Sequence, residues 1–135
     1  MELTIDQALQ QGVAAHRQGE LQDAERIYRA ILKVQPNHPD ANHNLGLLAF
    51  SVGKNQEALP LLKRALDANS QVEQFWLSYI GALIESESVG QARQAVAEAE
   101  QHGVSRERLD TFNSQLQTMP LPTKASHEQQ CQLLE

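Results

Sequence analysis

The chain repeats itself every 34 residues, and this period constrains its fold more than any other feature. The series with this spacing are Gly12 and Gly46, Gly19 and Gly53, and Ala24, Ala58 and Ala92. A unit of this length is too short to be a domain, but it is long enough for two helices and two turns. We therefore expect a stack of helix pairs in which each pair buries its apolar face against the next.

Apolar residues inside each repeat follow the spacing of a helix. Ala24, Ile27, Tyr28, Ile31 and Leu32 lie at i, i+3, i+4, i+7 and i+8, which is one face of an α-helix. The same spacing returns over 58–66 and 92–99, and partner helices are expected at about 5–18, 39–52 and 72–85. Apolar and polar residues never alternate over a useful length, so the sequence predicts an all-α fold without strands.

Capping residues and glycines suggest where the helices begin and where they meet. Capping boxes are expected at Thr4 with Gln7, Ser70 with Glu73 and Ser88 with Gln91, and an N-cap is expected at Asn55. Gly19 and Gly53 suit tight turns that need a positive φ, and Glu87 in their place predicts a less regular third turn. Gly12 and Gly46 fall inside helices, where we expect close helix packing opposite Ala24 and Ala58.

The repeat resembles the tetratricopeptide repeat. The matching residues are Trp76-x-x-Tyr79, Leu45-Gly46, Ala24-x-x-x-Tyr28 and the terminal Pro36, while Ala8 and Asn42 stand where Trp76 supplies the family's aromatic residue. The resemblance implies a right-handed α-solenoid of three helix pairs, with repeats at about 5–38, 39–72 and 73–106.

A further helix at about 106–117 carries Leu109, Phe112 and Leu116 on one face. Because a solenoid needs its last apolar face covered, we interpret this segment as a capping helix. Residues 1–117 would then form the repeat domain, and residues 118–135 a flexible tail, since Met119-Pro120-Leu121-Pro122 interrupts the helical pattern.

Composition excludes several classes of function. The net charge of −6 argues against nucleic-acid binding, and no apolar run is long enough to span a membrane. The first residues lack the pattern of a secretory signal, and the single Cys131 forms no internal disulfide, so we expect a cytoplasmic protein. The sequence has no phosphate-binding glycine loop, nucleophile elbow or His-Glu-x-x-His motif, so we expect no enzyme activity, cofactor or metal site.

The candidate site lies on the first helix of each repeat, which lines the concave groove in the tetratricopeptide family. The residues predicted to bind a peptide there are Gln10, Arg17, His43, Asn44, Leu47 and Ser78. Amides can pair with a peptide backbone, Leu47 offers an apolar contact, and Arg17 can meet a carboxylate. Some members clamp a terminal carboxylate with Lys, Asn and Arg, but only Asn44 matches that set, so this activity is not expected.

The function predicted first is a non-catalytic module that binds a protein or peptide in its groove. An alternative comes from the segments 38–46 and 75–80, which resemble amino-terminal repeats of bacterial multidomain proteins. In those proteins the repeats precede a glycosyltransferase of the O-linked N-acetylglucosamine type, a sulfotransferase or a methyltransferase. The chain would then recruit substrate or dimerise for a larger enzyme, which leaves a homo-oligomer open.

Overall fold

The computed structural model describes residues 3–118 and is all α-helical over that range. Its helices are α1 (Ile5–Arg17), α2 (Leu21–Val34), α3 (Pro39–Ser51), α4 (Asn55–Ala68), α5 (Glu73–Glu85), α6 (Val89–Gln101) and α7 (Arg106–Thr118). The helices expected in the three repeats and the helix after them are therefore confirmed, and residues 3–118 contain no strand. The predicted tail lies outside the described residues, except for Thr118, which ends α7.

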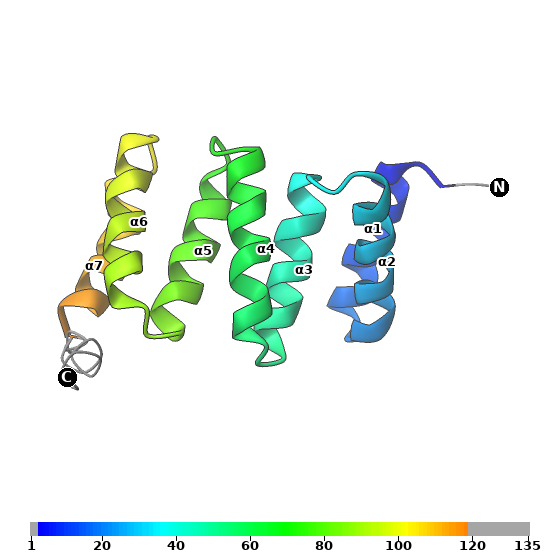
Figure 1. Ribbon diagram of the computed structural model, residues 1–135, viewed down its shortest axis with the longest axis horizontal. Coiled ribbons are helices and arrows are strands. Elements are labelled where there is room, and N and C mark those ends of the chain that lie inside the picture. The colour runs from blue at the N-terminus through cyan, green and yellow to red at the C-terminus, as the bar shows by residue number, and fades with distance from the viewer. Residues whose placement is uncertain (1–2, 119–135) are drawn as a thin grey trace, which may run out of the picture. The chain divides into compact units, whose positions relative to one another are not determined.

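The helices belong to two compact units, which meet inside α5 at residues 79 and 80. In the first unit, α1 pairs with α2, α3 pairs with α4, and α2 also packs on α3 (Figure 1). In the second unit, α7 packs against α6 and buries Leu109 and Leu116. The Arg93 guanidinium on α6 donates a hydrogen bond of 3.0 Å to the Leu116 carbonyl in the last turn of α7. This bond satisfies a helix-end carbonyl that has no partner within its own helix.

The core of the first unit explains the glycines inside helices. A Cβ added to Gly12 would lie 2.6 Å from Cε1 of Tyr28, and one added to Gly46 would lie 2.8 Å from Cδ2 of Leu62. The close approach is confirmed, and the atoms nearest to the two glycines belong to Tyr28 and Leu62 rather than to Ala24 and Ala58. Tyr28 and Leu62 stand one turn further along the same helices, and side chains lean toward the N-terminus of their own helix. The larger residue therefore covers the position that the alanine was expected to cover.

Only one of the four predicted helix caps forms as expected. Thr4 Oγ1 accepts a hydrogen bond of 3.0 Å from the Gln7 amide, and Gln7 Oε1 accepts one of 2.9 Å from the Thr4 amide. The N-cap of α4 is Lys54 instead of Asn55, and Ser88 occupies the cap of α6 without a side-chain bond. Helix α5 begins at Glu73, which places Ser70 two residues before the cap position. The tight turns before α4 and α6 fix where these two helices begin, so a suitable capping residue nearby does not determine the start.

The turns that follow α1, α3, α5 and α6 share one geometry, including the turn without glycine. Gly19, Gly53 and Gly103 have φ of 82°, 85° and 91°, and Glu87 has a φ of 61°. In each turn the next amide bonds to the carbonyl five residues before it, as in Ser88 to Leu83 at 2.9 Å and Lys54 to Ala49 at 2.9 Å. This is the bonding of a Schellman helix end. The expectation of a less regular third turn was therefore wrong, because hairpin closure holds Glu87 in the left-handed conformation.

Replacing Glu87 by glycine is expected to raise the free energy of unfolding by about 1 kcal/mol, because glycine adopts a positive φ without the steric cost of a Cβ. The reverse change at the matched turn, Gly53→Ala, should lower it by a similar amount. A Cβ at Gly53 would meet no atom within 4 Å, so only the backbone conformation is penalised there. Urea denaturation measures both changes, and a destabilised Glu87→Gly variant would contradict this account of the turn.

Asn42 takes over the role of the aromatic residue that it replaces. The indole Nε1 of Trp76 donates a hydrogen bond of 2.9 Å to the carbonyl of Ser70, six residues earlier. At the same position of the preceding repeat, Nδ2 of the fully buried Asn42 donates a bond of 3.0 Å to the carbonyl of Pro36, also six residues earlier. Either side chain therefore ties the start of its helix to the preceding connection.

Candidate functional site

The predicted site residues all lie in the first unit, on α1, α3 and the first part of α5. The structure places Gln10 and Arg17 exposed on α1, Asn44 and Leu47 half-buried on α3, Ser78 half-buried on α5, and His43 buried on α3. We call Gln10, Asn44 and Ser78, which occupy one repeat position, the polar row. Helices α1 and α3 are in contact, and α3 is bonded to α5 through His43 and Ser78. Arg17 lies seven residues beyond Gln10, about 10 Å along the helix, so it is apart from the row.

A chain of hydrogen bonds holds the α5 end of the polar row. Nε2 of His43 lies 2.8 Å from Oγ of Ser78. The same Oγ accepts a hydrogen bond of 3.2 Å from Nε2 of Gln74, one turn earlier on α5. The Ser78 hydroxyl is therefore fixed from two sides, and its position is coupled to α3.

His43 is a buried part of this arrangement. Its side chain is 7% exposed, and its ring lies against Phe75 with centroids 4.7 Å apart and planes tilted by 34°. Burial lowers the pKa of His43 below its ordinary value of 6.5, and this effect exceeds the smaller raising effects of a hydrogen bond with Asn44 and of the Asp40 charge. The neutral imidazole forms hydrogen bonds with Asn44 and Ser78. Because it is buried, it offers little surface of its own to a ligand.

The lowered pKa of His43 makes stability depend on pH. The unfolded chain takes up a proton near the ordinary value of 6.5, while the folded chain resists it. The free energy of unfolding should therefore be greatest above that value and should fall as the pH is lowered through about 6, with a slope of at most about 1.4 kcal/mol per pH unit. His43→Gln should have a flatter profile than the wild type between about pH 7.5 and 5.5 in urea denaturation. Parallel profiles for the two proteins would show that His43 does not resist protonation in the fold.

Two neighbours of the row were missing from the predicted set of binding residues. Gln74 precedes Ser78 by four residues on one helix, and this spacing predicts a contact between their side chains. Phe75 takes the repeat position of Gln7 and Ala41, so the repeat pattern alone does not point to it. Its partner is found only when α3 and α5 are placed beside each other.

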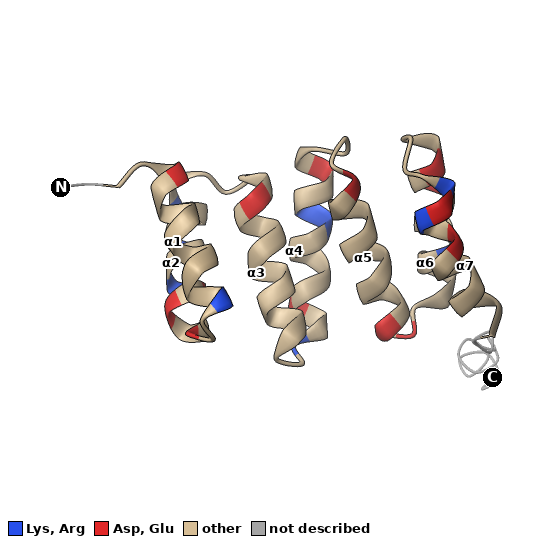
Figure 2. Cartoon of the chain, turned by 180° about the vertical axis from the view of Figure 1, so that it is seen from behind, with Lys and Arg blue, Asp and Glu red and all other residues tan. Residues whose placement is uncertain are grey.

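The first helices of the three repeats, α1, α3 and α5, carry mostly negative charges. Helices α3 and α5 contain no Lys or Arg, and Figure 2 shows red segments without blue on both. Helix α1 has one basic residue of this kind, Arg17 at its last position. The set of cations that would clamp a terminal carboxylate is therefore missing from α3 and α5.

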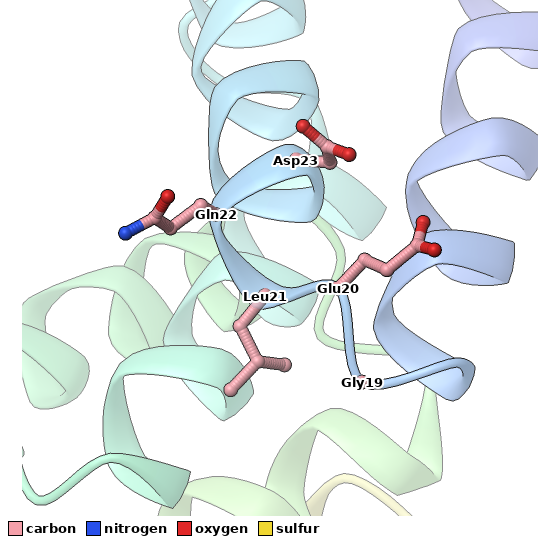
Figure 3. A pocket seen from close by; sticks show the side chains of 5 residues that line it. All are labelled: Gly19, Glu20, Leu21, Gln22 and Asp23. Atoms are coloured by element: carbon pink, nitrogen blue, oxygen red, sulfur yellow. The ribbon is translucent and has the colours of Figure 1, made fainter.

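A pocket lies at the connection between α1 and α2, and none of the predicted site residues lines it. It is lined by the consecutive residues Gly19, Glu20, Leu21, Gln22 and Asp23. The side chains of Glu20, Leu21 and Gln22 point in different directions (Figure 3). Asp23 is already paired with Arg26 at 3.2 Å, so the pocket presents no converging set of free polar groups.

None of the helices within residues 3–118 combines the length and the hydropathy that a membrane span requires. The same range contains no group of three or more His, Cys, Asp or Glu side chains placed to hold a metal ion.

Family models cover most of the helical region. A model described as tetratricopeptide repeat matches residues 9–71, and a second model with the same description matches residues 49–116. A curated relative, cellulose synthase operon protein C of Komagataeibacter xylinus, is 30% identical over 108 residues. The match covers 80% of this chain and 8% of that protein, so the chain spans only a small part of the relative's length.

Solved structures with a similar fold include a transferase and two separate TPR domains. An O-GlcNAc transferase of Thermobaculum terrenum is similar with a TM-score of 0.72 and 22% identity, over 86% of this chain and 23% of the other. The TPR2B domain of yeast Sti1, solved in complex with pHsp70, gives a TM-score of 0.75 at 14% identity and coverages of 84% and 95%. The first TPR of Spaghetti, bound to the HSP90 peptide SRMEEVD, gives 0.70 at 15% identity and coverages of 82% and 90%. At these identities the likeness establishes the α-solenoid fold.

Proposed function

Because the chain belongs to the tetratricopeptide repeat family, we propose that it is a non-catalytic interaction module that binds an extended peptide along α1, α3 and α5. Two of its structural neighbours were solved with a peptide or pHsp70 bound, which supports a binding role for this fold. The observation that carries the proposal is the polar row, in which Asn44 and Ser78 stay half-buried and Ser78 is fixed by His43 and Gln74.

The polar row suits the backbone of an extended peptide. Each amide side chain offers two N–H donors and a carbonyl acceptor, which are the groups that a peptide bond needs. Positions held before binding cost less entropy to order, and the bonds from His43 and Gln74 supply that order at Ser78. Leu47, half-buried one turn after Asn44, adds an apolar contact next to the amide.

Affinity for a short peptide is expected to be about micromolar, since the face has few anchors that are deeply buried. The test begins with a selection from a random peptide display library against the whole chain. The best selected peptide is then titrated against the wild type and the double variant Asn44→Ala with Leu47→Ala. The double variant should bind about tenfold more weakly, because it loses an amide pair and an apolar contact at one place.

A matched control is available on a second helix. Asn55→Ala with Leu59→Ala makes the same two changes on α4, again at half-buried positions. This control should leave the affinity within about twofold. If the α4 variant loses affinity and the α3 variant keeps it, with circular dichroism showing that both are folded, the α3 face is not the binding surface. Deleting residues 119–135 tests the remaining rival, in which that segment carries the interaction.

A second candidate function is that of a non-catalytic segment within a larger enzyme, and the small share of two relatives that the chain covers favours it. The chain matches 8% of cellulose synthase operon protein C and 23% of the O-GlcNAc transferase chain, so this fold occurs as a small part of larger proteins. In that case the repeats recruit substrate or dimerise for an attached enzyme. The reading frame beyond Glu135 and the sedimentation of the purified chain between about 1 and 100 µM distinguish the two roles.

The proposed setting is the cytoplasm, with protein partners and without nucleic acid. The net charge of −6 disfavours phosphate backbones, and the single cysteine fits a reducing compartment. Fractionation of cells followed by immunodetection of the chain tests the compartment.

A further inference from the structure

We infer that His43 fixes the hydroxyl of Ser78 as a hydrogen-bond acceptor, so that the peptide residue seated at Ser78 must offer a backbone N–H and cannot usefully be proline. This inference rests on the proposed function, because it specifies which chemical group the polar row takes at its α5 end. It follows from the hydrogen bonds that already occupy the serine and the imidazole.

Most of the hydrogen-bonding capacity of Ser78 is used within the fold. A serine hydroxyl has one O–H donor and two acceptor lone pairs. One lone pair accepts a bond of 3.2 Å from Nε2 of Gln74, and Nε2 of His43 lies 2.8 Å from the same Oγ. Whether the hydroxyl can donate to a ligand therefore depends on the direction of the bond between Ser78 and His43, which the imidazole tautomer decides.

The second hydrogen bond of His43 indicates the tautomer. The imidazole is also bonded to the side chain of Asn44, and this bond acts to raise the pKa of His43. A hydrogen bond raises the pKa of an imidazole when the ring donates it, because the bond then favours the protonated form. Since Nε2 faces Ser78, we assign the ring proton to Nδ1, which donates to Oδ1 of Asn44.

Burial keeps the imidazole in its neutral form, with a single ring proton. The side chain of His43 is 7% exposed, and this burial lowers its pKa more than the bond with Asn44 and the charge of Asp40 raise it. A neutral ring that is protonated at Nδ1 has an unprotonated Nε2, which can only accept. The hydroxyl of Ser78 therefore donates its one proton to His43.

One lone pair of Ser78 then remains for a ligand, and the half-buried hydroxyl keeps it within reach. The group that fills it must be a donor, and the backbone N–H of an extended peptide is one. Proline has no N–H, so it leaves this lone pair unmatched. At Asn44 the polarity is reversed, because the side-chain carbonyl accepts from His43 and leaves the amide N–H groups for a ligand carbonyl.

The test replaces each backbone amide of the best selected peptide, one at a time, by an ester, which removes the N–H without adding bulk. The ester at the residue that meets Ser78 should weaken binding to the wild-type chain about fivefold, as expected for one lost hydrogen bond. The same ester should cost less than about twofold in Ser78→Ala, because alanine has no lone pair to leave unmatched. Proline at that residue should also bind the wild type at least about fivefold more weakly.

The matched control is Ser114→Ala, which removes the hydroxyl of an exposed serine from α7. Every ester should have the same effect on this variant as on the wild type, since the two changes share no partner. Circular dichroism of both serine variants verifies that they are folded. If every ester has equal effects on the wild type and on Ser78→Ala, the inference is overturned.

The tautomer can be measured without any ligand, from the nitrogen chemical shifts of the His43 ring in the free chain at about pH 7.5. Nδ1 should be protonated and Nε2 should not. A proton on Nε2 would reverse the bond to Ser78, free its hydroxyl to donate, and overturn the inference.

The outcomes separate this inference from the proposed function. If the selected peptide binds and Asn44→Ala with Leu47→Ala weakens it, while no ester effect depends on Ser78, the face binds peptides and the inferred selectivity is wrong. If no selected peptide binds at this face, both the function and the selectivity are wrong.

Discussion

Ala58→Leu is expected to lower the free energy of unfolding by about 3 kcal/mol, because three added carbon atoms must enter a well-packed core. Ala58 is fully buried on α4, and so are Ala24 and Ala92, its equivalents in the other two repeats. The side chain at this position has no path to solvent, so neighbouring helices must shift to admit a leucine. Urea denaturation of the purified variant measures the loss.

Ala68→Leu is the matched control, because Ala68 is the last residue of the same helix and is exposed. A surface substitution of this kind should change stability by no more than about 0.5 kcal/mol. Equal midpoints for the two variants would mean that the repeat phase assigned to α4 is wrong.

Gly46→Ala is expected to lower the free energy of unfolding by about 1–2 kcal/mol, although alanine favours a helix over glycine by about 1 kcal/mol. The added Cβ would lie 2.8 Å from Cδ2 and 2.9 Å from Cγ of Leu62, and 3.3 Å from Cβ of Leu61. Leu62 is itself buried, so it cannot turn away without disturbing the core.

Gly81→Ala makes the same change inside α5 without the close contact. Its added Cβ would lie 3.9 Å from Cε1 of Phe112, which is an ordinary van der Waals distance. This control should therefore show the helix preference alone and gain up to about 1 kcal/mol. A Gly46→Ala variant as stable as Gly81→Ala would contradict the close packing of α3 on α4.

The period and the helical spacing of apolar residues are enough to predict the fold, because both express the burial of one face per helix. The details that failed depend on geometry between elements. The atoms nearest to Gly46 belong to Leu62 and not to the expected Ala58, because helix side chains lean toward the N-terminus of their own helix. The turn at Glu87 is regular because hairpin closure sets its φ against the preference of the residue.

In the candidate site, too, the sequence predicts some features, while others depend on contacts between helices that only the tertiary structure shows. Repeat phase places Gln10, Asn44 and Ser78 in one row, since the phase follows from sequence alone. The burial of His43 and its bond to Ser78 join residues 35 positions apart, and neither follows from the pattern within one helix. The pairing of Asp23, Glu25 and Asp67 with bases three or four residues away is local, so the sequence predicts it once the helices are known.

The most direct test of the proposed binding face is amide chemical-shift mapping with a peptide selected against the whole chain. Backbone amides are assigned for the free protein, and the peptide is added in steps until the shifts saturate. We predict that the largest changes fall on α1, α3 and residues 73–79 of α5, centred on Asn44, with small changes on α2 and α4. Saturable changes concentrated on α2 and α4, with the amides around Asn44 unmoved, would contradict the account.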